Sequence, residues 1–204
     1  ENIGSVLNKG FEVALKYQDK INNFGYFVQG NVSFARNKIT YMAETAGLES
    51  WTYQTGRSIG VVRGFEALGF FNTQDEIDDW AKSTYGSPQV GDIKYKDQKN
   101  DNIIDDNDFV PLGYSNVPEW NFGLTLGATY KNFDFNMLFS GVANRTLMIT
   151  NNVFLGMQGN TKVTNTAYDT WQQGVNESTA KYPRLTTEVI SHNMQNSTIW
   201  THKG

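Results

Sequence analysis

The chain has 204 residues and no cysteine, carries a net charge of −4 at pH 7, and is 14% aromatic. The missing cysteines exclude disulfides and thiolate metal sites, and the lack of a basic patch argues against nucleic acid as a partner. The first residues have neither the charged nor the apolar region of a signal peptide, and no run of about 18 apolar residues predicts a spanning helix.

Two strands are predicted near the start of the chain, at residues 11–17 and 26–36. Both segments alternate between apolar and polar or small residues, which is typical of strands with one apolar and one polar face. The connection between them, "QDKINNFG", is short. The next strand does not begin until residue 120, so residues 37–119 form a long loop.

This long loop contains signals of local structure. Thr73–Glu76 has the Thr-x-x-Glu pattern of a capping box and predicts the start of a short helix. The apolar stripe of that helix would comprise Ile77, Trp80 and Ala81. Acidic residues are concentrated in the same loop, above all in "GDIKYKDQKNDNIIDDNDF" at 91–109.

The acidic stretch has the spacing of a calcium loop of the EF-hand type. Its expected oxygen ligands are Asp97, Asp101, Ile103 through its backbone carbonyl, Asp105 and Asp108. Lys99 occupies another ligand position, and Asn102 stands where such loops have glycine. The alternative is a turn in which Asp and Asn side chains bond to their own backbone. The sequence leaves both interpretations open.

Two further strands are predicted at 120–130 and 133–141, joined by little more than Lys131-Asn132. A second long loop, 142–204, contains no comparable strand. A short helix is expected there at 164–174, with Ala167, Tyr168 and Trp171 on one face. The two histidines, His192 and His202, fall in a polar tail with no acidic residue at metal-ligand spacing.

The lengths and ends of the four strands favour a membrane barrel. Strands of about 9–11 residues suffice to cross a bilayer, whereas strands of soluble sandwiches are usually shorter. Aromatic residues stand at the strand ends, where barrels keep interfacial girdles. These are Tyr17, Tyr26, Trp120, Tyr130 and Phe133. Connections alternate between short and long, as in an up-and-down barrel.

The predicted fold class is therefore all-β: an antiparallel transmembrane barrel fragment of about four strands, with long extracellular loops containing short helices. The apolar rows, including Phe122, Leu124 and Phe135, would face lipid. The opposite rows would face a water-filled lumen; they include Asn31, Thr125, Asn136 and Ser140. A soluble antiparallel sandwich would show similar alternation.

Several stretches, taken in order, resemble the SusC/RagA-type TonB-dependent outer-membrane transporters. They are "NIGSVLNKGFEVALKY", "GRSIGVVRGFEALGFFNTQDEIDDW", "GDIKYKDQKNDNIIDDNDFVPLG" and "PEWNFGLTLGATYKNFDFNMLFSGVAN". The likeness covers almost the whole chain. Ser58 departs from the family, which commonly has proline there, and Lys99 and Asn102 depart from its acidic loop.

This resemblance implies that residues 1–204 are part of one barrel domain of about 22 strands. The parent protein would lie in the outer membrane of a Gram-negative cell, in contact with outer-membrane lipid, and import oligosaccharides or peptides. A SusD-like surface lipoprotein would close over its mouth. The TonB complex would supply energy through a plug-bearing N-terminal region, which precedes these residues in the family.

Two other classes of function are weighed beside the transporter. The alternative is a soluble β-rich carbohydrate-binding module with a structural calcium loop, which would stay monodisperse without detergent. In the transporter, four aromatic residues are candidates for stacking on a sugar, although loop aromatics usually pack: Trp51, Tyr53, Trp80 and Trp171. An enzyme is not expected, because no nucleophile motif or phosphate-binding glycine loop occurs, and neighbouring carboxylates such as Asp105 and Asp108 are common in solvated loops.

Overall fold

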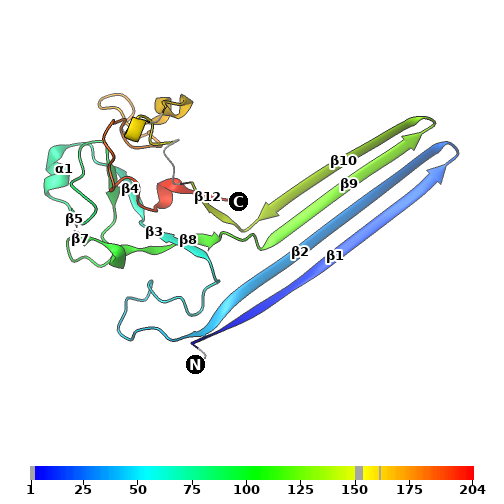
Figure 1. The fold of residues 1–204 in the computed structure, drawn as a ribbon, viewed down its shortest axis with the longest axis horizontal. Coiled ribbons are helices and arrows are strands. Elements are labelled where there is room, and N and C mark those ends of the chain that lie inside the picture. The colour runs from blue at the N-terminus through cyan, green and yellow to red at the C-terminus, as the bar shows by residue number, and fades with distance from the viewer. Residues whose placement is uncertain (1–2, 150–153, 161) are drawn as a thin grey trace.

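The protein, studied as a computed structural model, consists of one long sheet and a loop-built body at one end of it (Figure 1). The structure describes residues 3–149, 154–160 and 162–204. Part of the predicted loop 142–204, at 150–153 and 161, lies outside the described residues. The sheet has four antiparallel strands in the order β1-β2-β9-β10.

The four strands of this sheet confirm the four predicted from alternation. They are β1 (Gly4–Ile21), β2 (Phe24–Met42), β9 (Trp120–Tyr130) and β10 (Phe133–Ala143). The first two are longer than predicted, because they pair with each other almost from end to end. Each hairpin closes through a tight turn that starts with a residue in the left-handed region, Asn22 at φ 55° and Lys131 at φ 53°.

The register carries the pattern of each single strand across the whole sheet. Residues directly opposite each other in adjacent strands point to the same face. Phe11 pairs with Phe34, which pairs with Trp120, and no register shift interrupts the strands between these residues and the turns. All four apolar rows therefore fall on one face, and all four rows of mainly polar and small residues fall on the other.

The body is assembled from short strands and helical turns of the two long loops. Its paired strands are β3 (Val61–Gly64) with β8 (Val110–Ser115), β4 (Ala67–Phe70) with β6 (Ile93–Tyr95), β5 (Lys82–Ser83) with β7 (Ile103–Ile104), and β11 (Thr146–Met148) with β12 (Thr201–Lys203). Its helical elements are α1 (Gln74–Asp78) and 3₁₀ turns at Asp106–Asp108, Gln158–Asn160, Asn165–Asp169 and Thr198–Trp200.

The first predicted helix is correct in place but shorter than predicted. The Thr73 hydroxyl accepts a hydrogen bond from the Glu76 amide at 3.2 Å, so the predicted N-cap is confirmed. Helix α1 ends at Asp78, before Trp80 and Ala81. In the described part of the chain, no helix has the length and apolar character needed to cross a membrane.

The second predicted helix, at 164–174, is wrong in type and in its proposed face. Only a 3₁₀ turn forms, at Asn165–Asp169. Tyr168 is 82% exposed whereas Trp171 is 7% exposed, so these two side chains do not share a face. The Trp171 indole instead packs into the core of the body, because that core offers an apolar site which the short turn cannot provide.

The hydrophobic core lies in the body and not in the long sheet. Its members are Phe65, Phe70, Ile93, Tyr95, Ile104, Leu155, Trp171 and Trp200. By contrast, every residue of β1 is exposed, and so is most of β10. A soluble sandwich would bury the apolar face of the sheet against a second layer. Here the described residues place no second layer on that face.

Candidate functional site

The apolar face of the long sheet is the first candidate site. Large side chains on it are exposed: Phe122 by 49%, Phe135 by 54% and Phe133 by 79%. The rows are contiguous, since Leu15, Gly30, Leu124 and Phe139 follow one another across the strands. Contiguous apolar surface on this scale marks contact with another apolar phase or partner.

Aromatic residues border this face at both ends, as the sequence predicts. At the end next to the body, the Trp120 ring lies 4.7 Å from that of Phe34 and 5.7 Å from that of Phe11, between centroids. We call these three residues the outer belt. At the turns, the inner belt comprises Tyr17, Phe24, Tyr26, Tyr130 and Phe133.

The spacing of the two belts matches the apolar thickness of a membrane barrel. From Phe34 to Phe24 the strand spans about 34 Å, at roughly 3.4 Å per residue. A tilt of about 45° reduces this to about 24 Å along the membrane normal. The apolar band of outer-membrane barrels is about 25 Å tall.

The opposite face carries the residues predicted to meet water. Asn31, Thr125, Asn136 and Ser140 all fall on it. An aromatic side chain interrupts it, because the Phe27 ring lies across the backbone of Gly127, where a Cβ would come within 2.0 Å of the ring. Lys16 stands over the same ring, with its Nζ 5.6 Å from the centroid.

A buried ion pair holds the two long loops together in the body. The Asp92 carboxylate is fully buried, and its Oδ1 accepts hydrogen bonds from Arg184 Nε and Asn193 Nδ2, each at 2.9 Å. Its Oδ2 accepts from the Gln89 amide at 2.8 Å. Burying a carboxylate is costly unless it is paired and hydrogen-bonded in this way. Asp92 therefore fixes the second long loop onto the first.

His192 belongs to the same core, which corrects its predicted place in a polar tail. Its Nε2 lies 2.7 Å from the carbonyl oxygen of Ile93, and its Nδ1 lies 2.8 Å from Ser83 Oγ. A carbonyl only accepts, so Nε2 carries the hydrogen and Nδ1 accepts from the hydroxyl. Burial lowers the pKa of His192, because the imidazolium would lose its hydration. His202, in β12, is exposed.

In the first half of the acidic loop, Asp and Asn side chains bond to their own backbone. Asp97 Oδ1 accepts from the Asn100 amide at 2.6 Å, and Oδ2 accepts from the Asn102 amide at 2.8 Å. Both asparagines are in the left-handed region, with φ 57° and 63°. Asp101 pairs with Lys99, whose Nζ lies 3.0 Å from its Oδ2.

The second half of the loop is organised around a buried carboxylate. Asp108 Oδ1 accepts from the Gln98 amide at 2.8 Å, and Oδ2 accepts from the Asp105 amide at 3.0 Å. Burial raises the pKa of Asp108. Asp105 caps the 3₁₀ turn that contains Asp108. These carboxylates thus accept hydrogen bonds from backbone amides, and among the described residues no three or more acidic or histidine side chains are grouped so that they could hold a metal.

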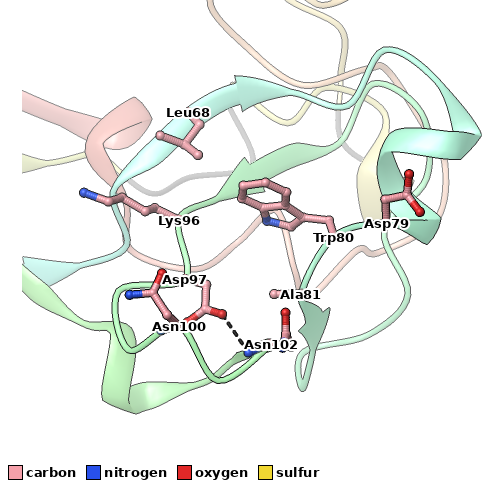
Figure 2. A pocket seen from close by; sticks show the side chains of 8 residues that line it. All are labelled: Leu68, Asp79, Trp80, Ala81, Lys96, Asp97, Asn100 and Asn102. Carbon is pink, nitrogen blue, oxygen red and sulfur yellow. Dashed lines mark hydrogen bonds between the residues drawn. The ribbon is translucent and has the colours of Figure 1, made fainter.

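A hollow of about 420 Å³ opens beside the acidic loop (Figure 2). Figure 2 shows Trp80, Leu68, Lys96 and Asp97 around it, together with Asp79, Ala81, Asn100 and Asn102. The Trp80 indole donates to the Tyr95 carbonyl at 2.8 Å, which fixes the ring. Lys94 Nζ stands 4.2 Å from its centroid. The hollow thus offers an aromatic wall, amides and both charges.

The other aromatic residues considered for stacking lie elsewhere. Trp171 is buried, and its indole donates to Asn72 Oδ1 at 3.0 Å. Trp51 donates to the carbonyl of Asn107 at 2.8 Å, and neither it nor Tyr53 lines the hollow. Sequence alone could not separate Trp80 from Trp171, because both occur in polar surroundings of the chain.

One comparison with known proteins shows the family of the chain, and another shows its fold. No family model matches the chain. A TonB-dependent receptor of Formosa agariphila, P26, is 34% identical over 153 residues, which cover 69% of this chain and 15% of that protein. The chain thus spans only a small part of this curated relative.

Solved structures give the same picture at the level of the fold. The RagAB peptide transporter matches with a TM-score of 0.66 and 16% identity, over 98% of this chain and 21% of that one. The RagAB peptide importer in its "closed-closed" state matches with a TM-score of 0.61 and 15% identity, over 100% and 22%. These names describe receptors and transporters, in agreement with the expectation that the chain is not an enzyme. The chain belongs to the TonB-dependent receptors, and its fold is that of part of a barrel transporter of the RagAB type.

Proposed function

We propose that the chain is part of an outer-membrane importer in which β1, β2, β9 and β10 cross the membrane. The observation that carries this proposal is the division of the sheet into one apolar face between two aromatic belts and one mainly polar face. A single-layer sheet of this kind is stable when lipid covers its apolar face and water covers its polar face.

The body then lies outside the cell, at the entrance of the lumen. Long loops of outer-membrane barrels are extracellular and short turns are periplasmic. The body has its own core and the Asp92–Arg184 ion pair, so it would present a fixed surface. We propose that a SusD-like lipoprotein docks at this entrance, and that the TonB complex supplies energy through a region outside residues 1–204.

The imported ligand is proposed to be a peptide or an oligosaccharide. RagAB is named a peptide transporter, which supports peptides. The hollow at Trp80 suits either class, because an aromatic wall beside amide groups can stack on a sugar ring or hold a peptide side chain.

A growth and fractionation experiment tests this proposal. The gene for the full-length receptor would be deleted in its host, which is then grown with either a peptide digest or mixed oligosaccharides as the sole nutrient. We expect slower growth on one of the two, restored by the intact gene and restored less well by Trp80→Ala. Tyr168→Ala, at an exposed site outside the hollow, is the matched control. Normal growth on both nutrients, with the receptor in the soluble fraction, would refute the proposal.

Calcium binding by Asp97, Asp101, Ile103, Asp105 and Asp108 stays a prediction. An ion would have to replace backbone amides as the partner of these carboxylates. Titration of the full-length receptor with calcium, followed by calorimetry, tests it. Absence of heat up to millimolar calcium, in the intact receptor and in Lys99→Asn alike, would contradict it.

A further inference from the structure

Three cations form a row on the apolar side of the sheet, immediately beyond the outer belt. Lys9 pairs with Arg36 two residues beyond the Phe11–Phe34 pair, and Lys38 follows two residues later opposite Leu7. Because alternate residues of a strand share a face, all three point to the same side as Phe11 and Phe34. The only register shift of this hairpin lies further out, between Ser5 and Val6. We call Lys9, Arg36 and Lys38 the cationic row.

The row keeps net positive charge after its internal pairing is counted. Arg36 donates to Glu119 through Nε and Nη2, each at 2.6 Å, and its guanidinium carbon stands 5.5 Å from the centre of the Phe34 ring. Lys9 and Lys38 are exposed, and within the described residues neither forms an ion pair. Two ammonium groups therefore remain available on this side of the sheet.

Lys9 and Arg36 lie at the height of the lipid headgroups, and Lys38 lies just beyond them. Lys9 and Arg36 lie about 7 Å beyond the belt along the strand, or about 5 Å along the normal at a tilt of 45°. Lys38 lies about 10 Å beyond it by the same conversion. Each headgroup layer is about 5–8 Å thick, and lysine stems extend along apolar surface to reach it.

At the turn end of the same face, the positive and negative charges balance. Asp19 lies there beside Tyr26, and Lys131 stands over the Tyr130 ring at 5.4 Å. These two charges balance, whereas the cationic row does not. The positive excess is thus confined to the end of the strands that carries the body.

We propose that the cationic row binds the phosphate of an anionic lipid in the outer leaflet. This rests on the proposed function, since the apolar face must meet lipid. The charge of the row complements a phosphate, and the row continues the lipid-facing surface without a break. A phosphodiester headgroup would be held by Lys9 and Lys38, with its acyl chains on the face bordered by Phe11, Phe34 and Trp120.

Native mass spectrometry of the full-length receptor in detergent micelles tests this inference. The probes are dioleoylphosphatidylglycerol, which is anionic, and dioleoylphosphatidylcholine, which is zwitterionic. A lysine near an anionic membrane surface contributes about a fivefold gain in affinity. We expect Lys9→Gln with Lys38→Gln to weaken phosphatidylglycerol binding by about 25-fold and to leave phosphatidylcholine binding unchanged.

The matched control is Lys20→Gln with Lys131→Gln, which removes two cations at the turn end, Lys20 from the polar face and Lys131 from the turn between β9 and β10. We expect it to change phosphatidylglycerol binding less than twofold. Equal weakening by both double variants, or equal binding of both lipids by the intact receptor, would contradict lipid binding by the cationic row. The proposal that the sheet lies in the membrane would be unaffected. Displacement of the lipid by millimolar inorganic phosphate would indicate a free-anion site and also contradict lipid binding by the row. A receptor that binds neither lipid would contradict the proposed function itself.

Discussion

Placing the same charge on adjacent residues of β9 should have opposite consequences, because these residues lie on opposite faces. Leu124 belongs to the apolar row between Gly30 and Phe139, and Thr125 belongs to the row between Gln29 and Leu138. Leu124 is four residues from Trp120 and six from Tyr130, which places it about 10 Å inside the outer belt and about 14 Å inside the inner one. This is close to the middle of the apolar band.

Arginine at the middle of a lipid-facing row costs about 2–4 kcal/mol, whereas a lumen-facing arginine stays in water. We therefore expect Leu124→Arg to reduce the folded receptor in the outer membrane more than tenfold, and Thr125→Arg to change it less than twofold. The folded fraction is measured as the heat-modifiable band on semi-native gels of outer-membrane preparations. Equal losses for the two variants, or a larger loss for Thr125→Arg, would refute the assignment of the two faces.

Three further predictions concern the body and the polar face. Arg184→Met leaves Asp92 buried without its counter-ion and should reduce the stability of the body by about 3–5 kcal/mol. Limited proteolysis should then cleave the loops faster, with Arg184→Lys intermediate. Unchanged proteolysis would contradict the role of the pair. Burial lowers the pKa of His192, so the unfolded chain binds a proton more readily than the folded chain does. The contribution of neutral His192 to the stability of the body is therefore complete above about pH 6.5 and decreases as the pH falls below that value. Limited proteolysis should be faster at pH 5 than at pH 7.5, and His192→Gln should remove this pH dependence. If the dependence persists in the variant, a group other than His192 causes it. Gly127→Ala would bring a Cβ within 2.0 Å of the Phe27 ring and should destabilise the sheet by about 1–3 kcal/mol, with Phe27→Ala restoring it; no rescue would show that the ring is not the obstacle.

The parts of the chain that depend on local pattern could be read without the structure. Strand alternation needs only the two-residue period of an extended chain, and it located all four strands of the long sheet. The helix cap at Thr73 depends on residues only three apart in the chain, so it is equally predictable from the sequence. A turn held by side-chain hydrogen bonds to the backbone is one of the two interpretations that the sequence leaves open for the acidic loop. These hydrogen bonds form because the short Asp side chain lies close to nearby backbone amides.

Interactions between residues far apart in the chain could not be read in this way. Asp92 and Arg184 are 92 residues apart, and Tyr95 and His192 are 97 apart, so no local pattern links them. His192 has polar neighbours in the sequence, yet the core of the body surrounds it. The alignment of Lys9 with Arg36 likewise depends on the register between two strands.

The sequence by itself therefore determined the strands, their two faces and the long loops between them. Tertiary structure alone decided that the loops carry the hydrophobic core, and which cations stand beside the outer belt. The physical reason is range: backbone alternation repeats within a few residues, whereas burial and register are settled only when distant segments pack together.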